Sequence, residues 1–166
     1  MKLKVGGFLH NSLVNGDGIR SVIFVSGCIH KCASCQNEFM QSFNYGDDVS
    51  IHDIIQKIKN NIPIIKGVTF SGGEPFESAL ALSRVSEEIR SLGLNIWCYS
   101  GYTYDEIVNS GDSDKLSLLG SIDVLIDGKF DETLKEGASN YTGSSNQRII
   151  DTRKSISQNK IILWNK

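Results

Sequence analysis

The feature that most constrains the fold is a series of four short apolar runs with the composition of buried β-strands. Each run is rich in β-branched and aromatic residues, and stretches with a helical apolar pattern separate the runs. Strands that alternate with helices favour a mostly parallel sheet with flanking helices, so we expect an α/β fold. The runs are residues 21–27, 64–70, 94–100 and 122–127.

The predicted helices have recognisable start and stop signals. Ser50 is the expected N-cap of a helix that continues through Asn60, and Gly93 is the expected C-cap of a helix over 77–92. A weaker helical pattern covers residues 104–119. The other segments are a lead-in at 1–20 with the turn signals of a hairpin, an irregular polar segment at 39–48, a long loop at 131–147 and short strands at 148–151 and 161–164.

Length and composition indicate one soluble globular domain. The chain has 166 residues, 40% hydrophobic and 22% charged, and we expect a single domain over 1–166 with a lead-in at 1–20 and a C-terminal extension at 131–166. The net charge of −2 contains no block of like charge, which argues against binding to nucleic acid or to a membrane surface. No apolar run approaches the ~20 residues of a membrane span, and the first residues do not resemble a signal peptide. We therefore expect a cytoplasmic protein whose thiols stay reduced.

Three of the four cysteines lie within eight residues, directly after the first apolar run. Cys28, Cys32 and Cys35 have the spacing Cys-x3-Cys-x2-Cys, and Gly27 and the small Ala33 suit a loop that wraps closely around a bulky object. An odd number of thiols cannot all pair as disulfides, and clustered cysteines in a reducing compartment more often hold metal. The spacing therefore predicts an inorganic centre at the end of a strand.

Three kinds of thiol chemistry fit this loop to different degrees. A reactive thiol pair would leave the third cysteine surplus. A structural zinc site normally needs four ligands, whereas an iron–sulfur cluster held by three thiolates leaves one iron open to a substrate or cofactor. The spacing favours the iron–sulfur cluster. For zinc, the fourth ligand would have to be His10, His30, His52 or Cys98.

Polar and glycine-rich sequences follow the predicted strands, at 27–37, 71–75, 100–102 and 127–130. In a parallel sheet these sequences meet at the carboxyl ends of the strands, where ligands gather. Gly72 and Gly73 allow the backbone to approach a ligand closely, and Glu74 can accept a hydrogen bond from an ammonium group. Taken alone, this turn is more simply explained as a strand–helix connection capped by Ser71; its position one strand beyond the cysteine loop favours a ligand site.

Two motifs together resemble those of the radical S-adenosylmethionine (SAM) superfamily: the cysteine spacing after one strand and Ser71-Gly72-Gly73-Glu74-Pro75 after the next. The resemblance implies an abbreviated partial (β/α) barrel in which Cys28, Cys32 and Cys35 bind a [4Fe–4S] cluster. It also implies that the amino and carboxylate groups of SAM chelate the open iron, and that reduction of the cluster cleaves SAM to methionine and a 5′-deoxyadenosyl radical.

Further segments narrow the resemblance to one family. Residues 14–20, 97–102, 124–130 and 143–148 resemble the activating proteins of anaerobic (class III) ribonucleoside-triphosphate reductases. The resemblance implies a radical SAM oxidoreductase, a glycyl-radical-enzyme activating enzyme, whose substrate is a glycine near the C-terminus of the reductase. Hydrogen abstraction would convert that glycine to a glycyl radical, and a reductant such as flavodoxin or ferredoxin would supply the electron.

The resemblance also assigns the SAM contacts to Ser34, Cys35, Gln36, Gly72, Gly73, Glu74, Ser100, Asp127 and Lys129. It implies that the turn containing Glu74 binds the amino group of SAM, and that Asp127 and Lys129 contact the ribose hydroxyls and the methionine carboxylate. The sequence departs from the family at two places. Ser34 stands where the family usually has glycine, and Gln36 where many relatives have tyrosine or histidine, but both departures leave the cysteines intact.

Other interpretations remain open for the function. One is a radical SAM enzyme that activates a different glycyl-radical enzyme, or that acts on a small molecule as a deazaguanine synthase does. Another, from a different class, is a non-enzymatic zinc or iron–sulfur binding module. Cys98 lies within a predicted strand and is expected to pack in the core. The three histidines show no partner pattern, so we expect each to be structural or solvated.

Overall fold

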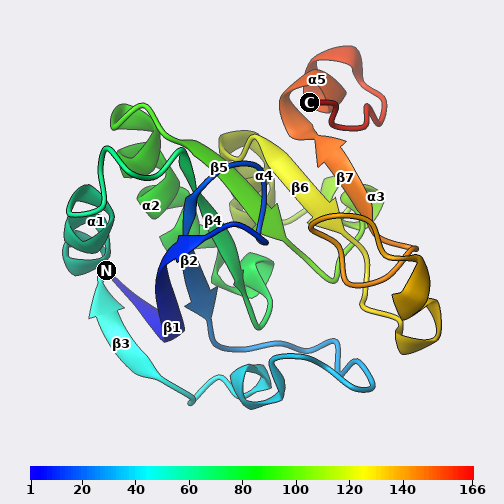
Figure 1. Ribbon diagram of the computed structural model, residues 1–166, viewed down its shortest axis with the longest axis horizontal. Helices are drawn as coiled ribbons and strands as arrows, with labels where there is room; N and C mark the ends of the chain where they lie inside the picture. Colours follow the sequence, from blue (N-terminus) through cyan, green and yellow to red (C-terminus); the bar gives the residue numbers. More distant parts are fainter.

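The computed structural model describes residues 1–166 and contains one seven-stranded sheet with the strand order β3-β1-β2-β4-β5-β6-β7 (Figure 1). The four central strands run parallel to one another, as the four apolar runs predicted. They consist mainly of buried residues because the sheet is covered on both faces. These strands are β2 (Arg20–Val25), β4 (Gly67–Gly72), β5 (Asn95–Tyr99) and β6 (Val124–Asp127).

Three further strands extend this parallel centre through antiparallel pairings, and they correct parts of the sequence prediction. Most of the expected lead-in is one long strand, β1 (Lys2–Ser12), which pairs with β2. The second, β3 (Asp47–Ser50), lies partly in the segment expected to be irregular; it forms an exposed sheet edge, so it has no apolar pattern. The third, β7 (Arg148–Asp151), was predicted and pairs with β6.

The C-terminal segment differs from the prediction. Residues 161–164 form only one isolated bridge, between Ile150 and Leu163, instead of a strand. The chain between β7 and this bridge forms a short helix, α5 (Thr152–Gln158), which the sequence did not predict. This helix contains a single large apolar residue, Ile156, so it offers no helical pattern to detect.

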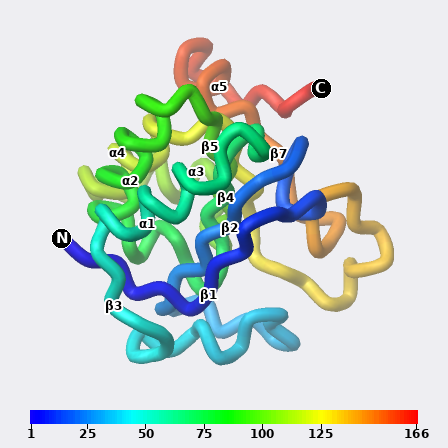
Figure 2. The backbone as a smooth tube through the Cα atoms, turned by 60° about the vertical axis from the view of Figure 1, so that its left-hand side comes forward, coloured from blue at the N-terminus to red at the C-terminus, as the bar shows by residue number.

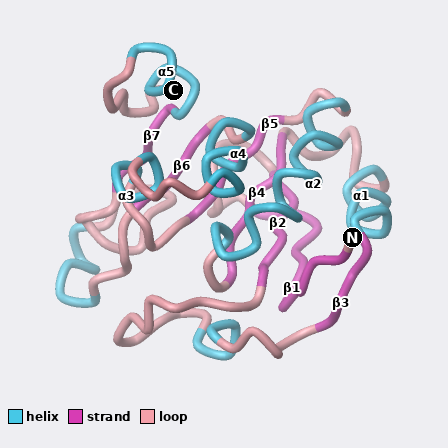
Figure 3. Tube along the Cα trace, turned by 180° about the vertical axis from the view of Figure 1, so that it is seen from behind, coloured by secondary structure: helices cyan, strands magenta, loops and turns pink.

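The longer helices pack on one face of the sheet and enclose an apolar core of 23 buried residues (Figure 3). They are α1 (Ile51–Lys59), α2 (Ala79–Ser91) and α4 (Ser113–Ser121). As predicted, Ser50 caps α1 by accepting a hydrogen bond from the Asp53 amide at 3.1 Å. The weak helical pattern at 104–119 is divided into α3 (Tyr104–Val108) and α4, because a turn at 109–112 interrupts it. Cys98 is fully buried in this core, as expected.

The opposite face of the sheet is covered by loops instead of long helices. Residues 13–19 cross it in front of β4 and β5 (Figure 1), and the Thr69 hydroxyl donates to the Asn15 carbonyl at 2.7 Å. Gly16 has a φ of +129°, and a Cβ there would lie 2.9 Å from the Trp97 ring. The buried Arg20 guanidinium lies 5.5 Å from the centroid of the same ring. The crossing therefore requires glycine at position 16.

All four parallel strands end at the same side of the molecule, where the connections gather. Figures 1 and 2 both show residues 26–46 running along this end, with the segment after β6 beside them. Short 3-10 helices lie in these connections: η1 (Glu38–Gln41), η2 (Pro75–Ser78) and η3 (Glu132–Gly137). This end of the sheet is where ligands bind in parallel α/β folds. None of the helices combines the length and apolar composition needed to cross a bilayer.

Candidate functional site

A cavity of about 450 Å³ opens at the carboxyl ends of β2, β4, β5 and β6. Its volume falls within the range of pockets that bind small molecules and cofactors. The three clustered cysteines line it, together with the glycine pair after β4 and the loops after β5 and β6. The predicted site residues that line it are Cys28, Cys32, Cys35, Gln36, Gly72, Gly73 and Ser100.

The cysteine loop is curled and held between two neighbouring segments. Lys31 and Ser34 have φ values of +52° and +56°, which turn the loop back on itself. The Gly27 amide donates to the Met40 carbonyl at 2.7 Å, and the Gly27 carbonyl accepts from the Glu74 amide at 2.8 Å. Gly27 has a φ of +108° and faces Phe43, so a larger residue has no room there. The loop is thereby fixed between η1 and the turn after β4.

The three thiols are free and half-buried. Burial raises the pKa of the Cys28 and Cys32 thiols, and the hydrogen bond from the His30 backbone partly offsets this effect at Cys28. Both thiols are therefore protonated at neutral pH without metal, and metal binding must release their protons.

The donor set fits an iron–sulfur cluster better than a four-ligand zinc site. The structure places none of the candidate fourth ligands free beside the thiols. Cys98 lies in the core, His52 is exposed on α1, and His10 lies near the start of β2, at the opposite end of the sheet. His30 lines the cavity, but its Nε2 contacts Glu74. No three His, Cys, Asp or Glu side chains surround a point that could hold a single metal ion.

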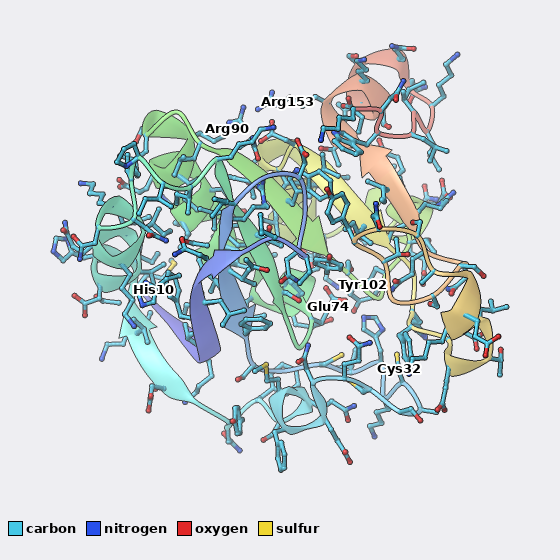
Figure 4. The ribbon with its side chains drawn as sticks, in the orientation of Figure 1. His10, Cys32, Glu74, Arg90, Tyr102 and Arg153 are labelled. Carbon is cyan, nitrogen blue, oxygen red and sulfur yellow. The ribbon has the colours of Figure 1, made fainter.

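The Glu74 carboxylate is fully buried and accepts several hydrogen bonds. Figure 4 labels Glu74 between the sheet and the loop that carries Cys32. Its Oε1 lies 2.7 Å from both His30 Nε2 and the Gly101 amide, and its Oε2 accepts from the Phe76 amide at 2.9 Å. The Ser100 hydroxyl lies 3.0 Å from each oxygen. These contacts direct both oxygens into the protein, whereas Gly72 and Gly73 line the cavity.

The place of His30 in the site was not predicted. The sequence showed no partner pattern for it and it was expected to be structural or solvated, and its side chain lies in the cavity wall and contacts Glu74. The two residues are 44 positions apart. No local spacing reveals such a contact, and only the prediction that both loops meet at the carboxyl ends of the strands could have suggested it.

Asp127 lies at the end of β6 but does not line the cavity. Its carboxylate is 1% exposed and accepts from Arg148 Nε at 3.0 Å and Arg148 Nη2 at 2.6 Å. It accepts from the Tyr104 amide at 2.8 Å as well, so it joins β6, β7 and the start of α3. These partners occupy the carboxylate, and the structure does not bring it to the cavity. The neighbouring Lys129 is exposed and does not line the cavity either, whereas Phe130 does.

Hydrogen bonds of Ser34 and Gln147 hold the loop after β6 in place. Ser34, exposed on the cysteine loop, donates to Glu132 Oε2 at 2.6 Å and does not line the cavity. Gln147 bridges the loop, donating to the Gly128 carbonyl at 2.9 Å and accepting from the Gly143 amide at 2.7 Å. The segment 143–148, singled out in the sequence, thus shapes the far wall of the cavity. Residues that line the cavity but were not predicted include Asn37, Tyr99, Tyr141 and Thr142.

A family model described as a 4Fe-4S single cluster domain matches residues 14–150, which include every residue that lines the cavity. Proteins named anaerobic ribonucleoside-triphosphate reductase-activating protein are similar along most of the chain. Those of Haemophilus influenzae, Escherichia coli K12 and Enterobacteria phage T4 are 38%, 34% and 30% identical to it. Each match covers 82% of this chain and 90%, 91% and 86% of the respective relative. The chain belongs to this activating-protein family.

A solved structure also shares the fold. QueE from Escherichia coli matches with a TM-score of 0.52 and 16% sequence identity, over 62% of this chain and 54% of QueE. This match confirms the predicted α/β architecture. The family resemblance given by the sequence motifs is confirmed as well, and the cysteine loop lies within the 4Fe-4S domain that the family model describes.

Proposed function

We propose that this protein activates an anaerobic ribonucleoside-triphosphate reductase through radical SAM chemistry, with Cys28, Cys32 and Cys35 as ligands of a [4Fe–4S] cluster. The observation that carries the proposal is one cavity, lined by three thiols and a glycine pair, in a chain of the activating-protein family. When bound and reduced, the cluster would supply the electron that cleaves SAM to methionine and a 5′-deoxyadenosyl radical, which abstracts hydrogen from a glycine near the C-terminus of the reductase.

We further propose that SAM lies against Gln36, Gly72, Gly73 and Ser100. These residues line the cavity beside the thiols, and the glycine pair exposes backbone there. Asn37 Nδ2 donates to the Gly72 carbonyl at 3.2 Å and holds this turn against the cysteine loop. Glu74 and Asp127 contribute indirectly, because their buried carboxylates fix the ends of β4, β5 and β6. Lys129 is exposed and its charge acts on the Cys32 thiol, so it can attract a carboxylate toward the cysteine loop.

The protein's own residues must also exclude water from a reactive radical. Phe130 and Tyr141 supply apolar surface on the cavity wall formed by the loop after β6. The cavity is open to solvent, so docking of the reductase would complete its enclosure. A small electron-transfer protein such as flavodoxin or ferredoxin is the proposed reductant.

The test is anaerobic reconstitution with iron and sulfide, followed by addition of SAM, a reductant and the reductase. We expect the electron paramagnetic resonance doublet of a glycyl radical on the reductase, and no doublet when SAM is omitted. SAM cleavage without a doublet would instead indicate another substrate, either a different glycyl-radical enzyme or a small molecule. A colourless protein that binds zinc tightly and does not cleave SAM would overturn the radical mechanism altogether.

A further inference from the structure

We propose that His30 is a positioning residue for SAM and that it acts through Glu74. The inference rests on the proposed function and adds to it a residue outside the cluster ligands. His30 lies on the cysteine loop between Cys28 and Cys32, and Glu74 follows the glycine pair on the next connection. One hydrogen bond between their side chains therefore joins the segment that holds the cluster to the segment proposed to hold SAM.

The contact between the two side chains is short and shielded from solvent. His30 Nε2 and Glu74 Oε1 are 2.7 Å apart, and the side chains are only 5% and 0% exposed. A buried carboxylate is costly unless each oxygen has donors. His30 supplies the one side-chain nitrogen among these donors; the others are the Ser100 hydroxyl and the amides of Phe76 and Gly101.

The neighbours of His30 fix the orientation of its ring. Tyr102 packs edge-to-face against the imidazole, with the ring centroids 4.5 Å apart. Gly101 lies so close that a Cβ there would be 2.5 Å from His30 Cδ2. Tyr102 is itself held by a hydrogen bond to Glu77. The imidazole therefore cannot turn away from Glu74 without disturbing the loop after β5.

The contacts of Glu74 affect the cavity wall that is proposed to bind SAM, which includes Gly72 and Gly73. The Glu74 amide donates to the Gly27 carbonyl at 2.8 Å, so the backbone and the side chain of Glu74 both bind the cysteine loop. Gly73, immediately before Glu74, faces the cavity. Loss of the imidazole donor leaves a buried carboxylate oxygen short of a partner, and the turn must shift to solvate it. Such a shift would move Gly72 and Gly73 relative to Cys28.

The experiment compares His30→Asn with His30→Gln. Both replacements are neutral amides, but only glutamine places its amide nitrogen where Nε2 lies in histidine. SAM binding is measured by equilibrium dialysis on anaerobically reconstituted protein and expressed per cluster. We expect His30→Asn to weaken SAM binding about tenfold to a hundredfold, the usual effect of losing a residue that orients a metal site, and His30→Gln to retain most of the affinity. His52→Gln, on the exposed side of α1, is the matched control and should bind SAM as the wild type does.

A second measurement separates action through Glu74 from direct contact with SAM. In a Glu74→Leu background, which removes the acceptor of the His30 hydrogen bond, His30→Asn should have no further effect on the SAM dissociation constant, because the two residues act as one unit. The SAM-induced change in the electron paramagnetic resonance spectrum of the reduced cluster should weaken in parallel. An equal loss of affinity in both backgrounds would show that His30 contacts SAM itself and would overturn the proposal.

Failure of this inference is distinguishable from failure of the proposed function. A wild-type protein that holds a cluster but binds no SAM would overturn the proposed function. A wild-type protein that binds SAM, with His30→Asn and His30→Gln binding it equally well, would overturn only the role of His30. Iron content should be the same in all variants, since the three cysteines are unchanged.

Discussion

At the scale of single residues, the site depends on side chains with separate tasks. The clustered cysteines line the cavity, whereas Cys98, fully buried on β5, packs among apolar residues. Glu74 and Asp127 are carboxylates at strand ends, but each is used within the protein. Burial and hydrogen-bond partners therefore separate the side chains that face the cavity from those that support the fold, and substitutions can test this distinction.

The first prediction concerns the cysteines. Cys32→Ala should reduce the iron retained after reconstitution to near background, because two thiolates cannot hold the cluster in place of three. Cys98→Ala should retain iron as the wild type does and lower the free energy of unfolding by about 1 kcal/mol through loss of core packing. Iron and sulfide analysis with visible absorption spectra checks both. Equal iron contents in the two variants would contradict the assignment of ligands.

The second prediction concerns Gly72. Its φ is +102°, and a Cβ there would lie 2.3 Å from the Val25 carbonyl oxygen. Gly72→Ala should therefore destabilise the metal-free protein by at least about 1–3 kcal/mol, because both strain and backbone overlap oppose the side chain. The matched control is Gly120→Ala on α4, where no neighbouring atom lies within 4 Å. That change should stabilise the protein by about 0.5–1 kcal/mol. Urea unfolding measures both, and a neutral Gly72→Ala would disprove the close approach.

Local features that line the cavity could be predicted from the sequence, whereas long-range pairings could not. The gathering of the three cysteines at a strand end was predicted because their spacing is local, and the place of Gly72 and Gly73 because a glycine pair after a strand implies close backbone approach. The partners of Glu74 and Asp127 were not predicted, because Gly101 and Arg148 are 27 and 21 positions away. A strand-end carboxylate has the same sequence signal whether it faces a ligand or another loop.

At the scale of elements, the predictability of a segment follows its burial. The parallel strands are buried on both faces and therefore stand out as apolar runs. The prediction failed at β3, a polar edge strand, and it gave no bounds for β1, where Gly6 and Gly7 interrupt the pattern. These strands form because neighbouring backbone groups need partners, and that requirement is not visible in their own side chains.

The third prediction concerns the loop at 13–19, which crosses the open face of the sheet. Asp17 anchors it, with Lys66 Nζ at 2.6 Å and Lys166 Nζ at 3.3 Å from its carboxylate oxygens. The hydrogen bond from Lys66 holds the pKa of Asp17 below its ordinary value. A lowered carboxylate pKa stabilises the folded state above the unfolded pKa of about 4, and this contribution is lost as the pH falls through the folded pKa.

Asp17→Asn should consequently lower the free energy of unfolding at pH 7 by about 1 kcal/mol or less, because Lys66 is half exposed. The difference from the wild type should shrink toward zero as the pH falls to about 3. Urea unfolding at several pH values gives the difference. Asp47→Asn, in an exposed position without an ion pair, is the control and should show little difference. A constant difference across the pH range for Asp17→Asn would contradict the ion-pair explanation.

At the scale of the whole molecule, the helices cover one face of the sheet and the chemistry gathers at one end. Two loops lie at this end: residues 38–46, which follow the cysteine loop, and residues 131–147, which line part of the cavity. Ser34 of the cysteine loop donates to Glu132 of the second loop at 2.6 Å. Apolar side chains are exposed on the first loop; Phe39 is 78% exposed and stacks on Tyr45. An exposed aromatic pair beside an open cavity is suited to burial against another protein.

The fourth prediction follows from the proposal that the reductase closes this cavity. Mixing the two proteins should slow amide hydrogen exchange in residues 38–46 and 131–147, because docking would bury both loops. The connections at 60–66 and 92–94 lie at the opposite end of the sheet and should exchange as before. Phe39→Asp should weaken the complex while leaving SAM cleavage unchanged, since Phe39 does not line the cavity. Unchanged protection of both loops in a mixture that still forms the glycyl radical would show that the reductase approaches the cavity from elsewhere.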